Sequence, residues 1–211
     1  MRLRKIKNAG SRLQANEGLF IVKPEELKGK WRTKFNNENP IYIEIGMGKG
    51  KFIIEHAKRN KNINYIGIEK YDSVLIKGVE KAASEELDNI YFLNVDAINL
   101  NNYFEKEEVD KIFLNFSDPW PKSRHAKRRL TSEAFLKVYE TILNKKGDIE
   151  FKTDNIGLFE YSVIEFNRLG YQFLEFSCDL HRFGDDIVTT EYEDKFMSKG
   201  NPIYYIKIKN K

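Results

Sequence analysis

The sequence predicts an α/β fold built on a doubly wound, mostly parallel sheet with helices on both faces. Three observations predict it: short β-rich apolar runs recur along the chain, segments with helical periodicity stand between them, and glycines or polar residues mark the boundaries. Alternation of strand and helix is typical of βαβ units, whose crossovers place helices over a parallel sheet. At 211 residues the chain fits one domain with additions better than two equal domains.

The apolar, β-rich runs predict seven strands, at residues 41–45, 64–69, 90–93, 111–116, 148–151, 171–176 and 203–208. Apolar side chains at helical spacing predict the intervening helices, at residues 51–58, 72–86, 135–146 and around 159–166. Gly147 follows the third of these helices. We expect it to end that helix, as a glycine just beyond a helix C-terminus commonly does.

Two segments fall outside this alternation. Residues 1–39 show no clear period and are expected to form an N-terminal extension to a domain that spans residues 40–211. The extension is interpreted either as a mobile, RNA-contacting arm or as a disordered, solubilising tail. Residues 178–200 join the last two strands with poor periodicity, and a connection of this length in a compact domain is usually functional or disordered.

Basic residues are concentrated in two places, although the net charge of the chain is only +4. The two patches hold ten basic residues and no acidic one: Arg2, Arg4, Lys5, Lys7, Arg12, Lys122, Arg124, Lys127, Arg128 and Arg129. The rest of the chain carries 26 basic and 32 acidic residues. An acidic body with two basic patches favours a polyanionic partner, although a charge run is often only a solvated face.

The remaining composition excludes several classes of protein. Cys178 is the single cysteine, so an intramolecular disulfide is excluded and a reducing compartment is favoured. The three histidines have no metal-ligand spacing with it, so no metal site is expected. We find no apolar stretch long enough for a signal-peptide core or a membrane span, and we therefore expect a cytoplasmic protein without membrane contact.

A glycine-rich turn follows the first predicted strand. Its sequence, from Gly46 through Gly48 to Gly50, leads into a helix, and its glycines permit positive φ and close approach of a ligand to the backbone. Lys51 occupies the place of the third glycine of a dinucleotide fingerprint, and the turn lacks the Gly-Lys-Ser/Thr of a phosphate-binding loop. The turn by itself is therefore only a weak indication of a ligand site.

Four carboxylates accompany this turn at the ends of the first four strands, namely Glu44, Glu69, Asp96 and Asp118. Ligands of such sheets bind beyond the carboxyl ends of the strands. Clustered acids would repel a pyrophosphate but suit a cationic ligand with ribose hydroxyls, which describes S-adenosylmethionine. Any one of these acids is as well explained by a solvated loop residue or a helix cap as by a ligand contact. The prediction of a cofactor site therefore depends on the coincidence of all four with the glycine-rich turn.

A stiff loop follows the fourth strand. Two prolines flank Trp120 directly after Asp118, so they restrict the backbone and would hold that carboxylate in a fixed place. The second basic patch begins a few residues after Asp118. Its lysines and arginines would contact phosphates and position a nucleic acid. Trp120 alone is as readily a packed core residue.

These motifs resemble the bacterial tRNA (guanine-N7-)-methyltransferase family over roughly residues 10–208. The resemblance is carried by Glu44-Ile45-Gly46-Met47-Gly48-Lys49-Gly50, Ile68-Glu69, Asp118-Pro119-Trp120-Pro121-Lys122, Phe151-Lys152-Thr153-Asp154 and Thr190-Glu191-Tyr192-Glu193. It implies a Rossmann-like methyltransferase sheet and transfer of a methyl group from S-adenosylmethionine to N7 of guanine 46 in the variable loop of tRNA.

The resemblance also implies roles for individual residues. The cofactor would be contacted by Glu44, Gly46, Gly48, Glu69, Asp96 and Asp118. The substrate base would be contacted by Lys122, Asp154, Thr190, Glu191, Tyr192 and Glu193. The RNA would be contacted by Arg124, His125, Ala126, Lys127, Arg128 and Arg129.

Guanine N7 carries a free lone pair at neutral pH, so the reaction would need alignment more than a general base. The methylated base is cationic, and Asp118 is the first candidate to stabilise that charge, with Asp154 second. Glu193 and Asp154 are expected to accept hydrogen bonds from guanine N1–H and the exocyclic amine, which would exclude adenine.

Other interpretations remain open. An S-adenosylmethionine-dependent methyltransferase acting on another RNA, a protein or a small molecule would have the acidic pocket. A non-catalytic RNA-binding protein on the same fold would explain the basic patches, but the strand-end acids argue against it. A nicotinamide-dependent oxidoreductase is disfavoured by the missing third glycine. The sequence is compatible with a monomer or a homodimer.

Overall fold

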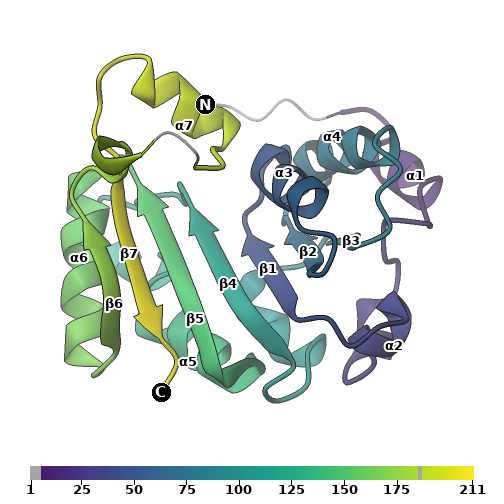
Figure 1. Ribbon diagram of the computed structural model, residues 1–211, viewed down its shortest axis with the longest axis horizontal. Helices are drawn as coiled ribbons and strands as arrows, with labels where there is room; N and C mark the ends of the chain where they lie inside the picture. The colour runs from purple at the N-terminus through teal and green to yellow at the C-terminus, as the bar shows by residue number, and fades with distance from the viewer. Residues whose placement is uncertain (1–5, 185–186) are drawn as a thin grey trace.

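A seven-stranded sheet forms the centre of the molecule in this computed structural model, which describes residues 6–184 and 187–211 (Figure 1). Its strand order is β3-β2-β1-β4-β5-β7-β6. The strands are β1 Ile41–Ile45, β2 Asn64–Ile68, β3 Ile90–Leu93, β4 Val109–Asn115, β5 Leu143–Thr153, β6 Gln172–Ser177 and β7 Tyr204–Lys209. Since β7 is antiparallel to both neighbours and the other pairings are parallel, the predicted fold class is confirmed.

Helices pack on both faces of this sheet. The α-helices are α1 Ala9–Gln14, α2 Trp31–Phe35, α3 Lys51–Arg59, α4 Asp72–Ala83, α5 Glu133–Ile142, α6 Ile156–Arg168 and α7 Glu191–Met197. The 3-10 helices are η1 Pro24–Leu27, η2 Ala97–Asn102, η3 Ser123–Arg128 and η4 Leu180–Phe183. Alternate residues of β2 belong to different apolar clusters: Tyr65 belongs to the cluster that contains the buried residues of α3 and α4, and Ile66 to the cluster that contains those of α5 and α6.

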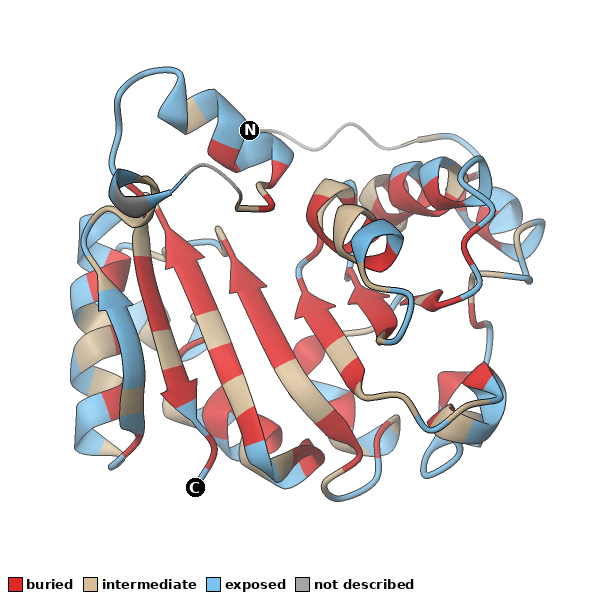
Figure 2. Cartoon of the chain, viewed as in Figure 1, coloured by how far each residue is buried: buried red, intermediate tan, exposed pale blue. Residues whose placement is uncertain are grey.

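The strands are short continuous apolar runs because the sheet is covered on both faces. Every residue of β2 is buried, and most of β1 and β3 is buried as well (Figure 2). Central parallel strands lose the alternation of apolar and polar residues when both sides face helices. This is why the expected positions of β1, β2 and β3 agree with the structure to within one residue, whereas β5 begins at Leu143, five residues before the expected start at 148.

Gly147 does not end a helix, and that expectation was wrong. Helix α5 stops at Ile142, and the chain enters β5 at once, so that Gly147 lies inside the strand. A Cβ at this position would lie 2.8 Å from the carbonyl oxygen of Asp110 and 2.7 Å from Cγ of Leu143. The glycine therefore serves the close approach of β4 to β5, a contact that no local pattern reveals.

Residues 9–39 pack into the core instead of standing apart from it. Trp31 is completely buried, its Nε1 donates to the carbonyl oxygen of Tyr103 at 2.8 Å, and its ring stacks on Phe104. Leu13 of α1 is buried against α4 on the other face of the sheet. Residues 1–5, which hold three of the five basic side chains of the first patch, lie outside the described residues.

The connection between β6 and β7 contains two short helices, η4 and α7. Figure 1 shows α7 at the top of the sheet, beyond the ends of β4, β5 and β7. In the described part of the chain, no helix combines the length and apolar character needed to cross a membrane. The functional residues predicted from sequence lie mostly at this same edge.

Candidate active site

The carboxyl ends of five parallel strands, β1 to β5, meet at one edge of the sheet. Strand β1 lies between β2 and β4, so the direction of chain progression reverses between β1 and β4. The glycine-rich turn leaves β1 at this reversal. Gly46 and Gly48 both have positive φ, 75° and 61°, and no atom lies within 4 Å of where a Cβ would stand. The turn therefore presents bare backbone to open space.

Glu69 holds this turn in place. Its Oε2 accepts a hydrogen bond from the Gly48 backbone N–H at 3.2 Å, and its Oε1 accepts one from Tyr71 at 3.0 Å. The side chain is 8% exposed, and burial raises the pKa of its carboxyl, with the charge of Asp118 adding to the effect. The electrostatic interaction with Asp118 agrees with the expected convergence of these strand ends.

Asp96 follows β3 and begins η2. Its Oδ1 accepts from the backbone N–H of Ile98 at 3.3 Å, and its Oδ2 pairs with Lys70 at 2.6 Å. The helix-cap interpretation therefore holds for Asp96, while the ion pair places it beside the residue that follows Glu69. A contact with a ligand ribose or base stays a prediction for this carboxylate.

Glu44 lies deeper than the other acids. It is 1% exposed, its Oε1 accepts from Nδ2 of Asn115 at 2.8 Å, and burial raises the pKa of its carboxyl to about 8. Its Oε2 has no partner in the described residues, and neither do the buried Oδ1 of Asn115 and Oγ of Ser117. Three unpaired polar oxygens thus lie at the adjoining ends of β1 and β4. Of the residues that carry them, the sequence analysis predicted only Glu44 as part of a site.

Asp118 stands on the strained loop that follows β4. It is exposed, and no hydrogen bond to its carboxylate is found among residues 6–184 and 187–211. Phe116 and Trp120, on either side of it, both adopt positive φ, 50° and 42°, which is unfavourable for such bulky residues. Strain of this kind is maintained only where the surrounding structure enforces it, and it occurs often at functional sites.

Arg129 enforces the shape of that loop. Its Nε donates to the carbonyl oxygen of Pro119 at 3.0 Å, and its Nη2 donates to that of Trp120, also at 3.0 Å. Its guanidinium group lies over the ring of Tyr161 from α6, 4.1 Å from the centroid. A residue expected from sequence to contact RNA thus has its donors directed at the loop that carries Asp118.

The rest of the basic tract is more open. Lys122, Arg124, Lys127 and Arg128 are exposed, on and just before the short helix η3. Arg128 lies over the Trp120 ring, 4.9 Å from its centroid, and the ring of His125 lies edge-on to the same indole. The tract is therefore held at its last residue, Arg129, to the loop that carries Asp118, and most of its other basic side chains are exposed.

Helix α7 closes another side of this edge. The Tyr192 ring lies 5.3 Å from that of Phe116 and stacks on Phe196 at 4.3 Å. Burial, and after it the charges of Asp154 and Asp118, raise the pKa of the Tyr192 hydroxyl. Asp154, at the end of β5, is half-buried, and burial raises the pKa of its carboxyl. The charges of Asp118 and Asp154 therefore both act on Tyr192, and the contacts of these residues with a cofactor or a substrate stay predictions.

Thr190 and Glu193 are both buried at the start of α7. They form a reciprocal capping box at the start of α7, with Glu193 N–H donating to Thr190 Oγ1 at 2.9 Å and Thr190 N–H donating to Glu193 Oε2 at 3.2 Å. Glu193 is completely buried, and its Oε1 also contacts Lys152 and His181. Glu191 is exposed by comparison.

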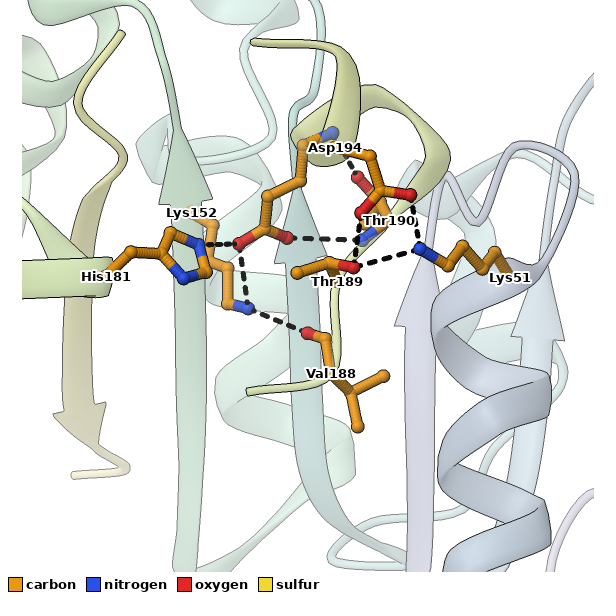
Figure 3. A network of polar contacts seen from close by, with 8 residues as sticks. Lys51, Lys152, His181, Val188, Thr189, Thr190 and Asp194 are labelled. Atoms are coloured by element: carbon orange, nitrogen blue, oxygen red, sulfur yellow. Dashed lines mark hydrogen bonds and ion pairs between the residues drawn. The ribbon is translucent and has the colours of Figure 1, made fainter. Parts of the chain in front are cut away.

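Sequence reasoning missed the residues that hold α7. Lys152 and His181 contact Glu193, while Lys51 pairs with Asp194 and donates to Thr189 Oγ1 at 2.9 Å (Figure 3). The one signal in the sequence was that Lys152 stands in the Phe151-Lys152-Thr153-Asp154 motif. The others come from segments far apart in sequence.

The edge suits the expected cofactor. The bare turn at Gly46 and Gly48 leaves room for a ligand against the backbone, and Glu69 and Asp96 lie at the next two strand ends. The orphaned oxygens around Glu44 and Asn115 provide acceptors for a cationic group. No cluster of three or more His, Cys, Asp or Glu side chains suited to a metal ion occurs in residues 6–184 or 187–211.

Comparisons with known proteins agree with this site. A family model described as "Putative methyltransferase" matches residues 38–206. The tRNA (guanine-N(7)-)-methyltransferase of Geobacillus sp. (strain WCH70) is 51% identical over 210 residues, which cover 99% of this chain and 96% of that protein. The protein of the same name from Bacillus subtilis (strain 168) is 49% identical over 209 residues, covering 99% and 98%.

Solved structures share the fold at low sequence identity. The 16S rRNA methyltransferase KamB has a TM-score of 0.65 at 12% identity and covers 87% of this chain and 94% of its own. A SAM-dependent methyltransferase from Aquifex aeolicus has a TM-score of 0.58 at 12% identity and covers 98% and 100%. Fold and site together define a methyltransferase of the doubly wound α/β class. More narrowly, the chain belongs to the tRNA (guanine-N(7)-)-methyltransferase family.

Proposed function

We propose that this protein transfers a methyl group from S-adenosylmethionine to N7 of guanine 46 in the variable loop of tRNA. The observation that carries the proposal is the placement of an exposed carboxylate, Asp118, between a bare glycine turn and an exposed basic tract, in a chain about half identical to relatives of that name. The turn would bind the cofactor, and the basic tract would bind the phosphate backbone of the RNA. The carboxylate would stabilise the positive charge of the methylated base.

Residues of β1, β2 and the β3 end would hold the cofactor. Gly46 and Gly48 offer backbone at close range, Glu69 faces the turn, and Asp96 follows β3. Glu44 would accept from a cationic group through its unpaired Oε2. When bound there, S-adenosylmethionine supplies a methyl group on a positively charged sulfur. The carboxylates that line the site would attract this charge.

Asp118, Asp154 and Tyr192 would surround the guanine. Asp118 is exposed and fixed by its loop, so it can stabilise the positive charge that the base gains when N7 is methylated. Asp154 would accept hydrogen bonds from the guanine N1–H and amine edge. Tyr192 and Phe116 offer aromatic faces for a base that has left its stack.

The basic tract would position the RNA. Lys122, Arg124, Lys127 and Arg128 are exposed and can contact phosphates without reading sequence, and His125 and Ala126 lie between them. Arg129 serves the loop instead, through its bonds to the carbonyls of Pro119 and Trp120. A tract that begins four residues after Asp118 fixes where the RNA backbone lies relative to the reacting base.

The test is methylation of tRNA with radiolabelled S-adenosylmethionine, followed by digestion and identification of the labelled nucleoside. We expect the label in 7-methylguanosine when unmodified tRNA with guanine 46 is supplied, and none when the same tRNA carries adenine 46. Label in another nucleoside would assign a different RNA substrate or atom. Cofactor binding without any transfer to tRNA would contradict the proposal and favour a small-molecule methyltransferase or a non-catalytic RNA-binding protein.

We further propose that the protein acts in the cytoplasm, because its substrate would be tRNA and its cysteine, Cys178, is free and exposed. The sequence-based expectation of a monomer or homodimer is tested by light scattering across a range of concentrations.

A further inference from the structure

The first two residues of α3 contact the chain at the start of α7. Lys51 begins α3 directly after the glycine-rich turn, and Phe52 follows it. Phe52 and Val188 belong to one small apolar cluster. Lys51 Nζ donates to Thr189 Oγ1 at 2.9 Å and also pairs with Asp194 of α7 (Figure 3). The helix that continues the glycine-rich turn is therefore bonded directly to α7.

Three side chains form a closed network at this contact. Besides the two bonds of Lys51, Thr189 Oγ1 donates to Asp194 Oδ1 at 2.6 Å. Burial raises the pKa of the Asp194 carboxyl, but the bonds from Lys51 and Thr189 outweigh it and hold that pKa below its usual value. The Lys51 and Asp194 side chains are 31% and 49% exposed, so their ion pair contributes little to the stability of the fold.

Helix α7 depends on such polar bonds for its position. Of its seven residues only Glu193 is buried, so few apolar contacts hold the helix against the rest of the protein. Segments with few buried apolar contacts open at a low cost in free energy. A weak ion pair at one end of α7 can therefore change how often the helix occupies the position described here.

The two sides of the network lead to different parts of the site. On one side, the glycine-rich turn is bonded to β2, since the Gly46 N–H donates to the carbonyl oxygen of Ile68 at 2.8 Å, and it continues into α3. A cofactor that rests on the turn would therefore restrain the start of α3. On the other side, the ring of Tyr192 from α7 lies against Phe116, two residues before Asp118.

We propose that Lys51 is a positioning residue that couples the cofactor turn to α7, so that a bound cofactor holds α7 in place and strengthens the binding of tRNA. The inference rests on the proposed function, because it takes tRNA as the ligand that meets α7. Coupling between two ligands is reciprocal, so bound tRNA raises the affinity for the cofactor by the same factor. The Lys51 side chain carries this effect through Asp194 and Thr189.

Binding of S-adenosylhomocysteine, the cofactor without its methyl group, measures this coupling in the absence of turnover. Its dissociation constant is determined by calorimetry without and with saturating unmodified tRNA, and the ratio of the two is the coupling factor. We expect a factor of about 5 or more in the wild type. In Lys51→Met it should be about 2-fold to 5-fold smaller, the range for a partly exposed ion pair. The probe lacks the sulfonium charge, so direct attraction between cofactor and phosphates does not produce the factor.

Lys58→Met is the matched control. Lys58 lies on the same helix and pairs with Glu85, just beyond α4, at 3.0 Å and with similar exposure. This variant should keep the wild-type coupling factor, and Lys51→Arg should retain most of it because a cation still meets Asp194. Asp194→Asn should lower the factor as Lys51→Met does, and the double variant should lower it no further. An unchanged factor in Lys51→Met, or an equal loss in Lys58→Met, would overturn the proposal.

Backbone amide exchange separates this inference from the proposed function. S-adenosylhomocysteine added without RNA should slow the exchange of residues 188–197 in the wild type and in Lys51→Arg, but not in Lys51→Met. If this response is present and the wild type does not methylate tRNA, only the proposed function is contradicted. If the wild type shows no response, or Lys51→Met responds equally, the inference is overturned even when tRNA methylation is confirmed.

Discussion

Asp118 combines two properties that are rarely found together, exposure to solvent and a rigid backbone. Two flanking residues with positive φ and the arginine that holds their carbonyls fix where the carboxylate stands. Its oxygens receive no donor from the described part of the chain. A side chain of this kind contributes little to stability, and its effect should be seen in chemistry.

Asp118→Asn should therefore lower kcat by about 100-fold to 1,000-fold, the usual cost of removing one preorganised charge from a transition state. The free energy of unfolding should stay within about 0.5 kcal/mol of the wild-type value, as for exposed positions. Single-turnover methylation of tRNA and a urea melt measure both quantities. A variant with near-normal turnover would remove Asp118 from the chemistry.

Glu44 makes stability depend on pH in an unusual direction. In the folded protein burial raises the pKa of this carboxyl to about 8, against a usual value of 4.5. The folded state therefore holds a proton that the unfolded state has lost between these values, and the free energy of unfolding falls as pH rises through that window. Burial also lowers the pKa of His56 to about 4 from 6.5, which has the opposite sign.

The two groups oppose each other below pH 6.5, so the effect of Glu44 is clearest between pH 6.5 and 8. We expect the wild type to lose about 2 kcal/mol more than Glu44→Gln across this interval, at about 1.4 kcal/mol per pH unit. Urea unfolding at half-unit pH steps measures the difference. Parallel pH profiles for the two proteins would show that Glu44 is ionised throughout.

At the scale of elements, the basic tract holds exposed residues, which we propose contact RNA, and one residue, Arg129, that is bonded to the preceding loop. Lys127 is exposed, whereas the guanidinium of Arg129 is bonded to two carbonyls and lies over Tyr161. Phosphate contacts make binding depend on salt, and internal contacts do not.

Lys127→Ala should weaken tRNA binding and reduce its salt slope by about 1, with kcat unchanged. Arg129→Lys should leave that slope unchanged and lower kcat by about 10-fold, because lysine cannot bond both carbonyls in one plane. Binding isotherms from 50 to 300 mM salt, beside single-turnover rates, compare them. The reverse pattern would return Arg129 to the RNA surface.

Across the whole molecule, the N-terminal segment is part of the core. Trp31, the first residue of α2, is completely buried; a Glu108 carboxylate oxygen accepts its backbone N–H at 3.1 Å, and the carbonyl oxygen of Tyr103 accepts its indole N–H. Removal of residues 1–39 would thus expose the apolar surface that α2 covers, although the sequence alone suggested a separate extension.

Trp31→Ala should cost about 3 to 5 kcal/mol in the free energy of unfolding, as for large buried aromatics. Val22→Ala is the control, since Val22 is 49% exposed and belongs to the same segment. Guanidinium unfolding of both variants measures the contrast. Equal, small losses would mean that residues 1–39 fold independently of the sheet.

The sequence by itself determined the class of fold, the positions of the strands other than the early start of β5, and the strand-end acids. It could do so because central parallel strands are continuous apolar runs, and because the residues that end them converge by topology alone. Gly46, Glu69 and Asp118 were found in this way. Membership of the family, indicated by the same motifs, was confirmed by the relatives.

Only the tertiary structure decided which polar side chains are exposed at this edge and which are paired inside the protein. Glu191 and Glu193 are two residues apart in one short helix, yet one is exposed and the other is completely buried against Lys152. Arg128 and Arg129 are adjacent, yet their guanidinium groups serve different purposes. The physical reason is that burial and pairing depend on segments distant in sequence, and a local pattern records residue type and spacing but not the partner that folding brings into contact.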